Sequence, residues 1–286
     1  MSRAVDRAVE RALDTADRVA AWGTRLLRGR GIRRTWLVVA CLVAVPMLAL
    51  GTIQAASALA HEERTEVTEV DAADVRGLIV DNEAGSIRVV GVDDADTVTV
   101  HARISDGLRA TGHQVSRRDA TLVVRGSCPL FGSEWCSVDY TIEVPADLHV
   151  DVDGRQRVTV SDVSGGLVAS SDASAVELAR VGGDVTVSAN QARIDASDLT
   201  AARVHARADQ GHVTLEFAES PDEVVAEADQ GSVDIVLPDE DDVDYATETE
   251  ANRGTVSDAI RQDPRSARSI TVEADQGSIT IAYAAS

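Results

Sequence analysis

Two of the three cysteines lie close together, and the chemistry they predict is a disulfide bond. Cys128 and Cys136 stand eight residues apart in SCPLFGSEWCS, where Pro129 and Gly132 favour a turn that brings the two thiols within bonding distance. Outside the cytoplasm a disulfide is the expected state, and two free thiols are the alternative. A zinc pair is disfavoured, because no second pair of Cys or His stands at ligand spacing. Cys41 lies apart, in a long apolar run.

The six histidines are scattered along the chain and predict no catalytic or metal centre. His61-Glu62 begins an HExxH pattern, but position 65 is Thr, so the metalloprotease interpretation fails. His205 and His212 fall in neighbouring repeat units, yet two ligands do not complete a zinc site. The phosphate-binding and nucleophile-elbow motifs are also missing from the sequence. We therefore expect no enzyme activity, no cofactor and no metal.

Carboxylates gather in the run DEDDVD, from Asp239 to Asp244, and recur in the tetrapeptide ADQG. Clustered carboxylates are ligands for Ca²⁺, but a solvated acidic loop is the favoured interpretation of DEDDVD. In ADQG we expect Gly to supply a positive φ at a corner and Asp to accept hydrogen bonds from local backbone amides. The predicted turn residues are Asp209, Gly211, Asp229, Gly231, Asp275 and Gly277.

These turns belong to a repeat with a step of nine to eleven residues. Short apolar triplets begin at Val158, Leu167, Val176, Val185, Ile194, Val204, Val213, Val224 and Val233. Each triplet alternates apolar and polar residues, which is the period of a strand with one buried face. Strands this short must stack to bury that face, so we expect two units per coil of about 18 to 20 residues. Residues 151–286 are predicted to form a single β-helix-like solenoid, with a narrow core that contains many Ala residues.

The region before the repeat is predicted to cap the solenoid, and two loops are expected to interrupt it. Residues 76–150 contain strand candidates and a turn at Asp119, which favour β-hairpins that cover the first coil. Residues 61–75, HEERTEVTEVDAADV, are interpreted as a solvated stalk. We expect loops at DEDDVD and at SDAIRQDPRSAR (257–268), and the segment ITVEADQGSITIAY then supplies the last two strands.

Charge and hydropathy divide the chain into three parts. Residues 1–34 hold nine Arg against four acidic residues, a charge of +5, whereas residues 35–60 are uncharged. The formal net charge of −21 therefore leaves −26 for residues 61–286. An apolar run of this length, with Arg before it, predicts one transmembrane helix with the N-terminus in the cytoplasm and the C-terminal part outside. Nucleic acid is an unexpected partner for so acidic a chain.

Two features of the N-terminal part leave alternatives open. Ala58-Leu59-Ala60 fits a signal-peptidase pattern, so cleavage before His61 rivals a permanent anchor, although the apolar run is longer than a usual signal. A buried core helix is a further alternative for the run. Residues 1–34 show apolar positions three and four apart, typical of an amphipathic helix on the inner leaflet or of one that binds a cytoplasmic partner.

The repeat units resemble a known bacterial family. YTIEVP (140–145), GGDVTV (182–187), QGSVDIVLP (230–238) and VEADQGSITI (272–281) are similar to the "putative adhesin" domain of unknown function numbered 4097. The resemblance covers roughly 75–283, and GRQRVTVSDV (154–163) departs from it, because Gln156-Arg157 replaces the usual Gly-Asp. It implies an extracytoplasmic β-solenoid behind one membrane helix, in a high-GC Gram-positive bacterium, with no catalytic residues.

The expected function is that of a non-catalytic, adhesin-like binding or structural module of the cell envelope. The expected partners are the membrane, which the chain spans once, and an unidentified envelope or surface ligand. The alternative is an envelope-stress sensor, in which the ectodomain signals through the Arg-rich segment to a cytoplasmic partner.

Overall fold

The computed structural model describes residues 40, 42–45, 47, 62–106, 110–129 and 136–284. The chain divides into two compact units, Met1–His61 and Glu62–Ser286. In the first unit, Ala40, Leu42–Val45 and Met47 are helical. No helix among the described residues is both long enough and apolar enough to cross a bilayer. The predicted amphipathic segment 1–34 and most of the predicted span 35–60 lie outside the described residues.

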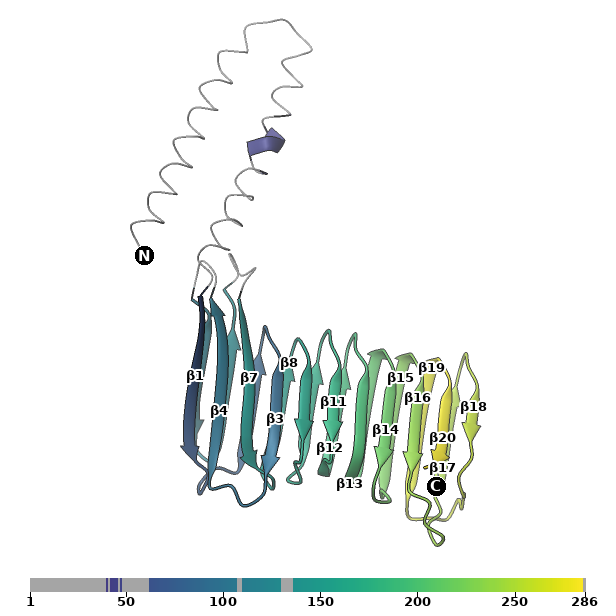
Figure 1. The fold of residues 1–286 in the computed structure, drawn as a ribbon. Helices are drawn as coiled ribbons and strands as arrows, with labels where there is room; N and C mark the ends of the chain where they lie inside the picture. The colour runs from purple at the N-terminus through teal and green to yellow at the C-terminus, as the bar shows by residue number, and fades with distance from the viewer. Residues whose placement is uncertain are drawn as a thin grey trace, which may run out of the picture. The chain divides into compact units, whose positions relative to one another are not determined.

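The second unit is built from β-strands, which confirms the all-β prediction for this part of the chain (Figure 1). The strands belong to two sheets, which we call sheet 1 and sheet 2. In spatial order, sheet 1 contains β1 (Glu62–Asp71), β4 (Thr97–Asp106), β7 (Ser137–Pro145), β3 (Ile87–Val92), β9 (Val158–Ser161), β11 (Val176–Ala179), β13 (Ile194–Gln210), β14 (Val213–Phe217), β16 (Val233–Leu237), β20 (Ile279–Tyr283) and β18 (Val256–Asp258).

Sheet 2 packs against sheet 1 and shares the strand β13 with it. Its spatial order is β5 (Gly112–Arg118), β6 (Thr121–Ser127), β2 (Gly77–Asn82), β8 (His149–Gly154), β10 (Leu167–Ser171), β12 (Gly182–Ala189), β13, β15 (Glu223–Gln230), β19 (Ser269–Gln276) and β17 (Ala246–Ala251). The first half of β13 pairs in sheet 1 and the second half in sheet 2, and Asp198 has a positive φ of 53° between them.

From β8 to β16, strands alternate between the two sheets and pair in parallel, mostly with the strand two places along; β13, which spans both sheets, also pairs with its chain neighbours β12 and β14. Val176 pairs with Val158 and Ile194, and Val213 pairs with Ile194 and Val233, so paired residues lie 18 to 20 positions apart. The core lies between the sheets, where Val, Ile, Leu and Ala side chains from alternate positions are buried. Among the described residues, aromatic rings are few in this core: Tyr140 and Tyr245 are fully buried, and Phe217 is nearly so.

Both ends of the stack depart from the order of the chain. At the N-terminal end, β2 and β3 lie between the later strands β6/β7 and β8/β9, with parallel pairing on both sides. At the C-terminal end, β19 and β20 lie between β15/β16 and the earlier strands β17/β18. The segment ITVEADQGSITIAY does supply the last two strands of the chain, but β17 and β18 form the last layer of the stack.

The predicted cap is partly antiparallel, as the turn signals indicated. β5 and β6 form a hairpin whose corner residue, Asp119, has a positive φ of 54°, and β4 pairs antiparallel with β7. The parallel stacking nevertheless begins earlier than residue 151, since β2/β3 and β6/β7 already pair in parallel.

Two segments expected to be irregular contain strands. Residues 62–71, interpreted as a stalk, form β1, which pairs with β4 along its whole length. The stalk prediction is wrong, because charged residues such as Glu62 and Glu69 are exposed on an edge strand as well as on a solvated segment. Likewise β18 takes up residues 256–258, so the loop predicted at 257–268 begins only after it.

Candidate functional site: the polar N-terminal end of the stack

The predicted disulfide is present and closes the crossing from sheet 2 to sheet 1. Cys128 follows β6 and Cys136 precedes β7, and their Cα atoms are 5.9 Å apart. The Thr111 hydroxyl lies 3.2 Å from the Cys136 sulfur, which brings the bond next to the start of β5. Phe131 and Trp135, between the two cysteines, lie outside the described residues.

The ADQG glycines stack on one another, but not for the reason that the sequence suggested. A positive φ occurs at Gly85, Gly166 and Gly183 and at none of Gly211, Gly231 and Gly277, so that part of the prediction is wrong. Instead each glycine lies against the carbonyl of the previous layer. A Cβ on Gly231 would stand 1.5 Å from the Gly211 carbonyl oxygen, and a Cβ on Gly277 would stand 1.7 Å from that of Gly231. Close backbone approach therefore requires glycine here.

The aspartates of ADQG form a row beside these glycines. Arg207 contacts Asp209 at 3.3 Å and Asp229 at 3.4 Å, and Asp275 accepts a hydrogen bond of 2.5 Å from the Asn252 amide. In these contacts the aspartates bind side chains of their own or neighbouring layers, whereas the sequence predicted hydrogen bonds from local backbone amides. The row carries charge along the corner of the stack.

Ion pairs between layers connect the outer surface of the stack. Arg203 donates two hydrogen bonds to Asp184, at 3.0 and 2.6 Å, and Arg180 pairs in the same way with Asp162. The hydrogen bonds from these guanidinium groups lower the pKa of both Asp184 and Asp162. Exposed pairs of this kind contribute little to stability, so their main effect is to organise the charge of the surface.

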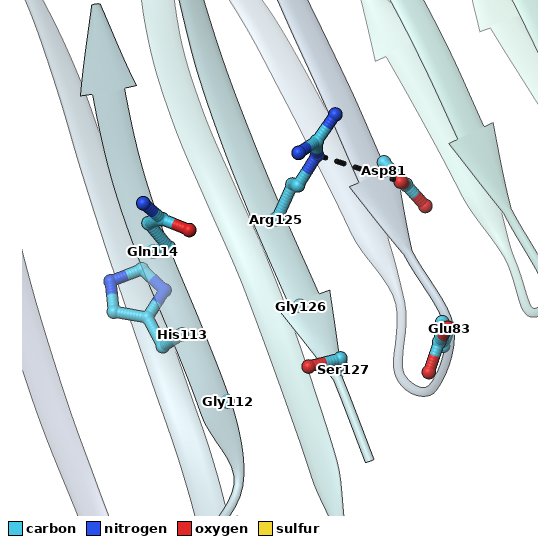
Figure 2. A pocket seen from close by; sticks show the side chains of 8 residues that line it. All are labelled: Asp81, Glu83, Gly112, His113, Gln114, Arg125, Gly126 and Ser127. Atoms are coloured by element: carbon cyan, nitrogen blue, oxygen red, sulfur yellow. Dashed lines mark ion pairs between the residues drawn. The ribbon is translucent and has the colours of Figure 1, made fainter.

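An open hollow lies at the N-terminal end of sheet 2 and has a volume of about 490 Å³. Figure 2 shows its lining residues on neighbouring strands. Arg125 extends toward Asp81, and Glu83 lies on the turn after β2. The guanidinium of Arg125 and the carboxylate of Asp81 are 3.8 Å apart. Gln114, Ser127 and His113 add hydrogen-bond donors and acceptors to the lining, which suits polar groups.

Beside this hollow, a chain of polar contacts joins the two sheets. The Asp106 carboxylate accepts hydrogen bonds from the Thr111 amide, at 2.7 Å, and from Arg64. Arg64 also contacts Glu66 at 2.9 Å, and a Glu66 carboxylate oxygen lies 3.9 Å from His113 Nε2. The sequence does not reveal this group, because its members come from β1, β4 and the start of β5 and stand in no recognisable motif.

The last two side chains of this group lie deeper: Tyr140 is buried, and the His113 side chain is 7% exposed. His113 Nδ1 lies 2.9 Å from the Tyr140 hydroxyl, which donates a hydrogen bond of 3.0 Å to the Arg125 carbonyl. Burial lowers the pKa of His113, while Glu66 raises it and Arg64 lowers it to a smaller degree. Burial, with a further contribution from Glu66, raises the pKa of the Tyr140 phenol. Both shifts favour the neutral form of the side chain.

The residues weighed for metal binding do not come together. Across the ranges that the structure describes, no group of three or more His, Cys, Asp or Glu side chains could hold a metal ion. In the acidic run 239–244, Asp239 and Asp244 lie 3.1 and 3.8 Å from Arg261. Part of that run is thus engaged in ion pairs.

No protein-family model and no curated protein matches this sequence. Solved structures that are similar to the chain include a "putative cell adhesion protein" from Clostridium sporogenes, with 14% identity, 78% of this chain and 100% of that chain covered, and a TM-score of 0.37. A "putative adhesin" from Bacteroides fragilis has 16% identity, covers 77% and 97% of the two chains, and has a TM-score of 0.36. At TM-scores this low, neither likeness carries an argument about this chain.

Proposed function

We propose that residues 62–286 form an acidic β-solenoid that acts as a non-catalytic, adhesin-like binding or structural module of a bacterial cell envelope. The observation that carries the proposal is the parallel register of β8 to β16, in which paired residues lie 17 to 20 positions apart. Such stacking produces long outer surfaces from short repeats, and extended surfaces are what repeat proteins use for recognition.

The outer surfaces carry an excess of negative charge. The side chains that point away from the core are largely carboxylates, hydroxyls and the Arg residues paired with them, for example Asp184 with Arg203 and Glu227 with Arg207. A partner that supplies cations or hydrogen-bond donors would suit these surfaces, and polyanions such as nucleic acid would be repelled.

The proposal includes a single membrane span over residues 35–60, with the N-terminus in the cytoplasm. Its support is the uncharged run together with the step from +5 before it to −26 after it. Protease treatment of spheroplasts that carry tags at both ends of the chain tests it. Digestion should remove the C-terminal tag and leave the N-terminal tag intact, and full protection of residues 62–286 would refute this topology.

Proximity labelling tests the binding role. A labelling enzyme fused after residue 286 should mark a set of envelope neighbours, and the matched control carries the same enzyme directly after residue 61. Because the control lacks the stack, neighbours that bind the stack should be absent from its labelled set. Identical sets would mean that the stack recruits no partner.

The sensor alternative is distinguished by the cytoplasmic segment. If residues 62–286 report envelope stress inward, removal of residues 2–30 should abolish the phenotype that the full chain restores in a deletion strain. Full complementation by the shortened chain would leave the binding module as the better account.

A further inference from the structure

At the C-terminal end of the stack, the three segments that lead into β15, β17 and β19 meet. Because β19 lies between β15 and β17, these strands begin side by side. The Ser269 amide donates a hydrogen bond of 3.0 Å to the Asp222 carbonyl, and the Ala246 amide donates one of 2.9 Å to the Arg268 carbonyl. The segments joined in this way are the turn 218–222 and the loops 238–245 and 259–268.

Tyr245 is the buried residue at this meeting point. Its side chain is fully buried, its amide donates to the Arg261 carbonyl at 3.2 Å, and its carbonyl accepts from the Asp263 amide at 3.0 Å. Burial raises the pKa of the Tyr245 phenol, whereas the neighbouring Ser220 hydroxyl and Arg268 guanidinium lower it. The tip of the ring therefore lies beside a serine from one segment and an arginine from another.

Three buried polar atoms at this point have no hydrogen-bond partner among the described residues. They are Ser220 Oγ, the Tyr245 hydroxyl oxygen and Arg268 Nη1. A fourth such atom, Arg261 Nε, faces the Asp244 carboxylate at 3.8 Å. The first three are neighbours and yet do not bond to one another. Since buried polar groups in folded proteins are almost always bonded, a small molecule between these three atoms is the arrangement that satisfies them.

The donors and charges define the chemical class of this molecule. Arg268 Nη1 can only donate, whereas the two hydroxyl groups can donate or accept. A metal cation would be repelled by Arg268. An anion would find no unbalanced positive charge, because the Arg268 guanidinium lies 3.6 Å from Asp222 and that of Arg261 lies 3.1 Å from Asp239. A neutral molecule that both donates and accepts is required, and a buried water with two to four polar partners has these properties.

We propose that Ser220, Tyr245 and Arg268 bind one buried water molecule, which joins the turn before β15 to the loops before β17 and β19. The water accepts hydrogen bonds from Arg268 Nη1 and from the Tyr245 hydroxyl, and it donates one to Ser220 Oγ. It is thereby part of the joint that holds the inserted strand β19 between its two neighbours.

A crystal structure of the full-length chain, from crystals soaked in sodium bromide, tests the identity of the ligand. We expect one density peak at hydrogen-bond distance from all three atoms, without anomalous signal at the bromine edge. An anomalous peak at this place would show that the site takes an anion. Direct hydrogen bonds among the three side chains, with no peak between them, would show that they bind no molecule. Either result would overturn the proposal.

Thermal unfolding of variants of the full-length chain in detergent micelles tests the bonds independently. Tyr245→Phe keeps the ring and removes one partner of the water, so the melting temperature should fall by about 2 to 4 °C. If the hydroxyl had no partner, its removal would leave the melting temperature unchanged or raise it, and the proposal would be refuted.

Ser220→Ala removes a second partner and should lower the melting temperature by a similar amount. Its matched control is Ser257→Ala, on the exposed outer face of β18, which should melt as the parent does. An equal fall in both serine variants would contradict a specific role for Ser220.

Discussion

Gly231 lies against the backbone of Gly211 so closely that a Cβ on Gly231 would stand 1.5 Å from the Gly211 carbonyl oxygen. The contact recurs through the stack. Gly277 lies in the same way on Gly231 and Gly254 on Gly277, with corresponding distances of 1.7 and 1.6 Å. One corner of the stack is therefore a column of glycines, in which the hydrogen-bonded layers approach without side chains between them.

Substitution of a glycine in this column should destabilise the stack. Gly231→Ala places a methyl group into backbone atoms, which cannot rotate away as a flexible side chain can. Overpacking of this kind costs about 2–3 kcal/mol, and the melting temperature should fall by about 4 to 12 °C. Thermal unfolding followed by circular dichroism measures the effect.

The control for this prediction is Gly77→Ala. Gly77 is the first residue of β2, and a Cβ there would meet its nearest atom at 3.7 Å, an ordinary contact. Its melting temperature should stay within about 2 °C of the parent chain, since the added methyl group displaces no atom and substitutions without such a clash usually change stability by about 0.5 kcal/mol or less. Equal effects of the two alanines would contradict the close-approach explanation.

Removal of the disulfide should destabilise the N-terminal end. The bond closes a short loop between β6 and β7, and for a loop of this size the chain-entropy model gives about 2–3 kcal/mol. Cys128→Ala combined with Cys136→Ala should therefore melt several degrees below the parent chain. A reductant should lower the melting temperature of the parent to that of the double variant and leave the variant unchanged. A reductant with no effect on the parent would show that the bond contributes nothing.

The inward threonines of the last layer should keep the C-terminal end free of other strands. Thr247 and Thr249 of β17 face the core side, since they pair with the buried Ile270 and Val272, and β17 is the edge of sheet 2. Changing both to Val makes this edge apolar, so we expect association that grows with concentration in sedimentation velocity. Thr271→Val on the exposed outer face of β19 is the matched control and should stay as the parent. Association of the control to the same extent would refute a specific role for the edge.

Folding should disfavour the charged form of the Asp151 side chain. It lies in β8 between Ile79 and Val168, and burial raises its pKa, an effect that His149 opposes and Asp153 reinforces. Because the pKa is higher in the folded state, the protonated Asp151 side chain stabilises the fold below the pKa of the unfolded chain, about 3.8. This contribution is lost as the pH rises through the pKa of the folded state. Asp151→Asn should therefore raise the melting temperature at pH 7 and leave it unchanged at pH 3.5. A lower melting temperature at pH 7 would contradict this.

Local patterns in the sequence were sufficient for part of this structure. Alternation in triplets such as Val158 to Val160 predicted the strands, because a side chain on every second residue faces the core whatever its neighbour is. The spacing of the triplets predicted pairing partners about 18 to 20 residues apart. Cys128 and Cys136 predicted their bond, and Asp119 its turn, since both depend on residues close together in the chain.

The tertiary structure alone decided the order of layers at both ends and the polar group at the N-terminal end. The strands β2 and β19 carry the same alternating pattern as their neighbours, so periodicity does not tell beside which edge each will lie. The sequence predicted that the ADQG corners need glycine for a positive φ, whereas the need arises from a carbonyl group in the preceding layer. Glu66, His113 and Tyr140 are far apart in sequence, and only the meeting of β1, β5 and β7 turns three ordinary strand residues into one coupled group.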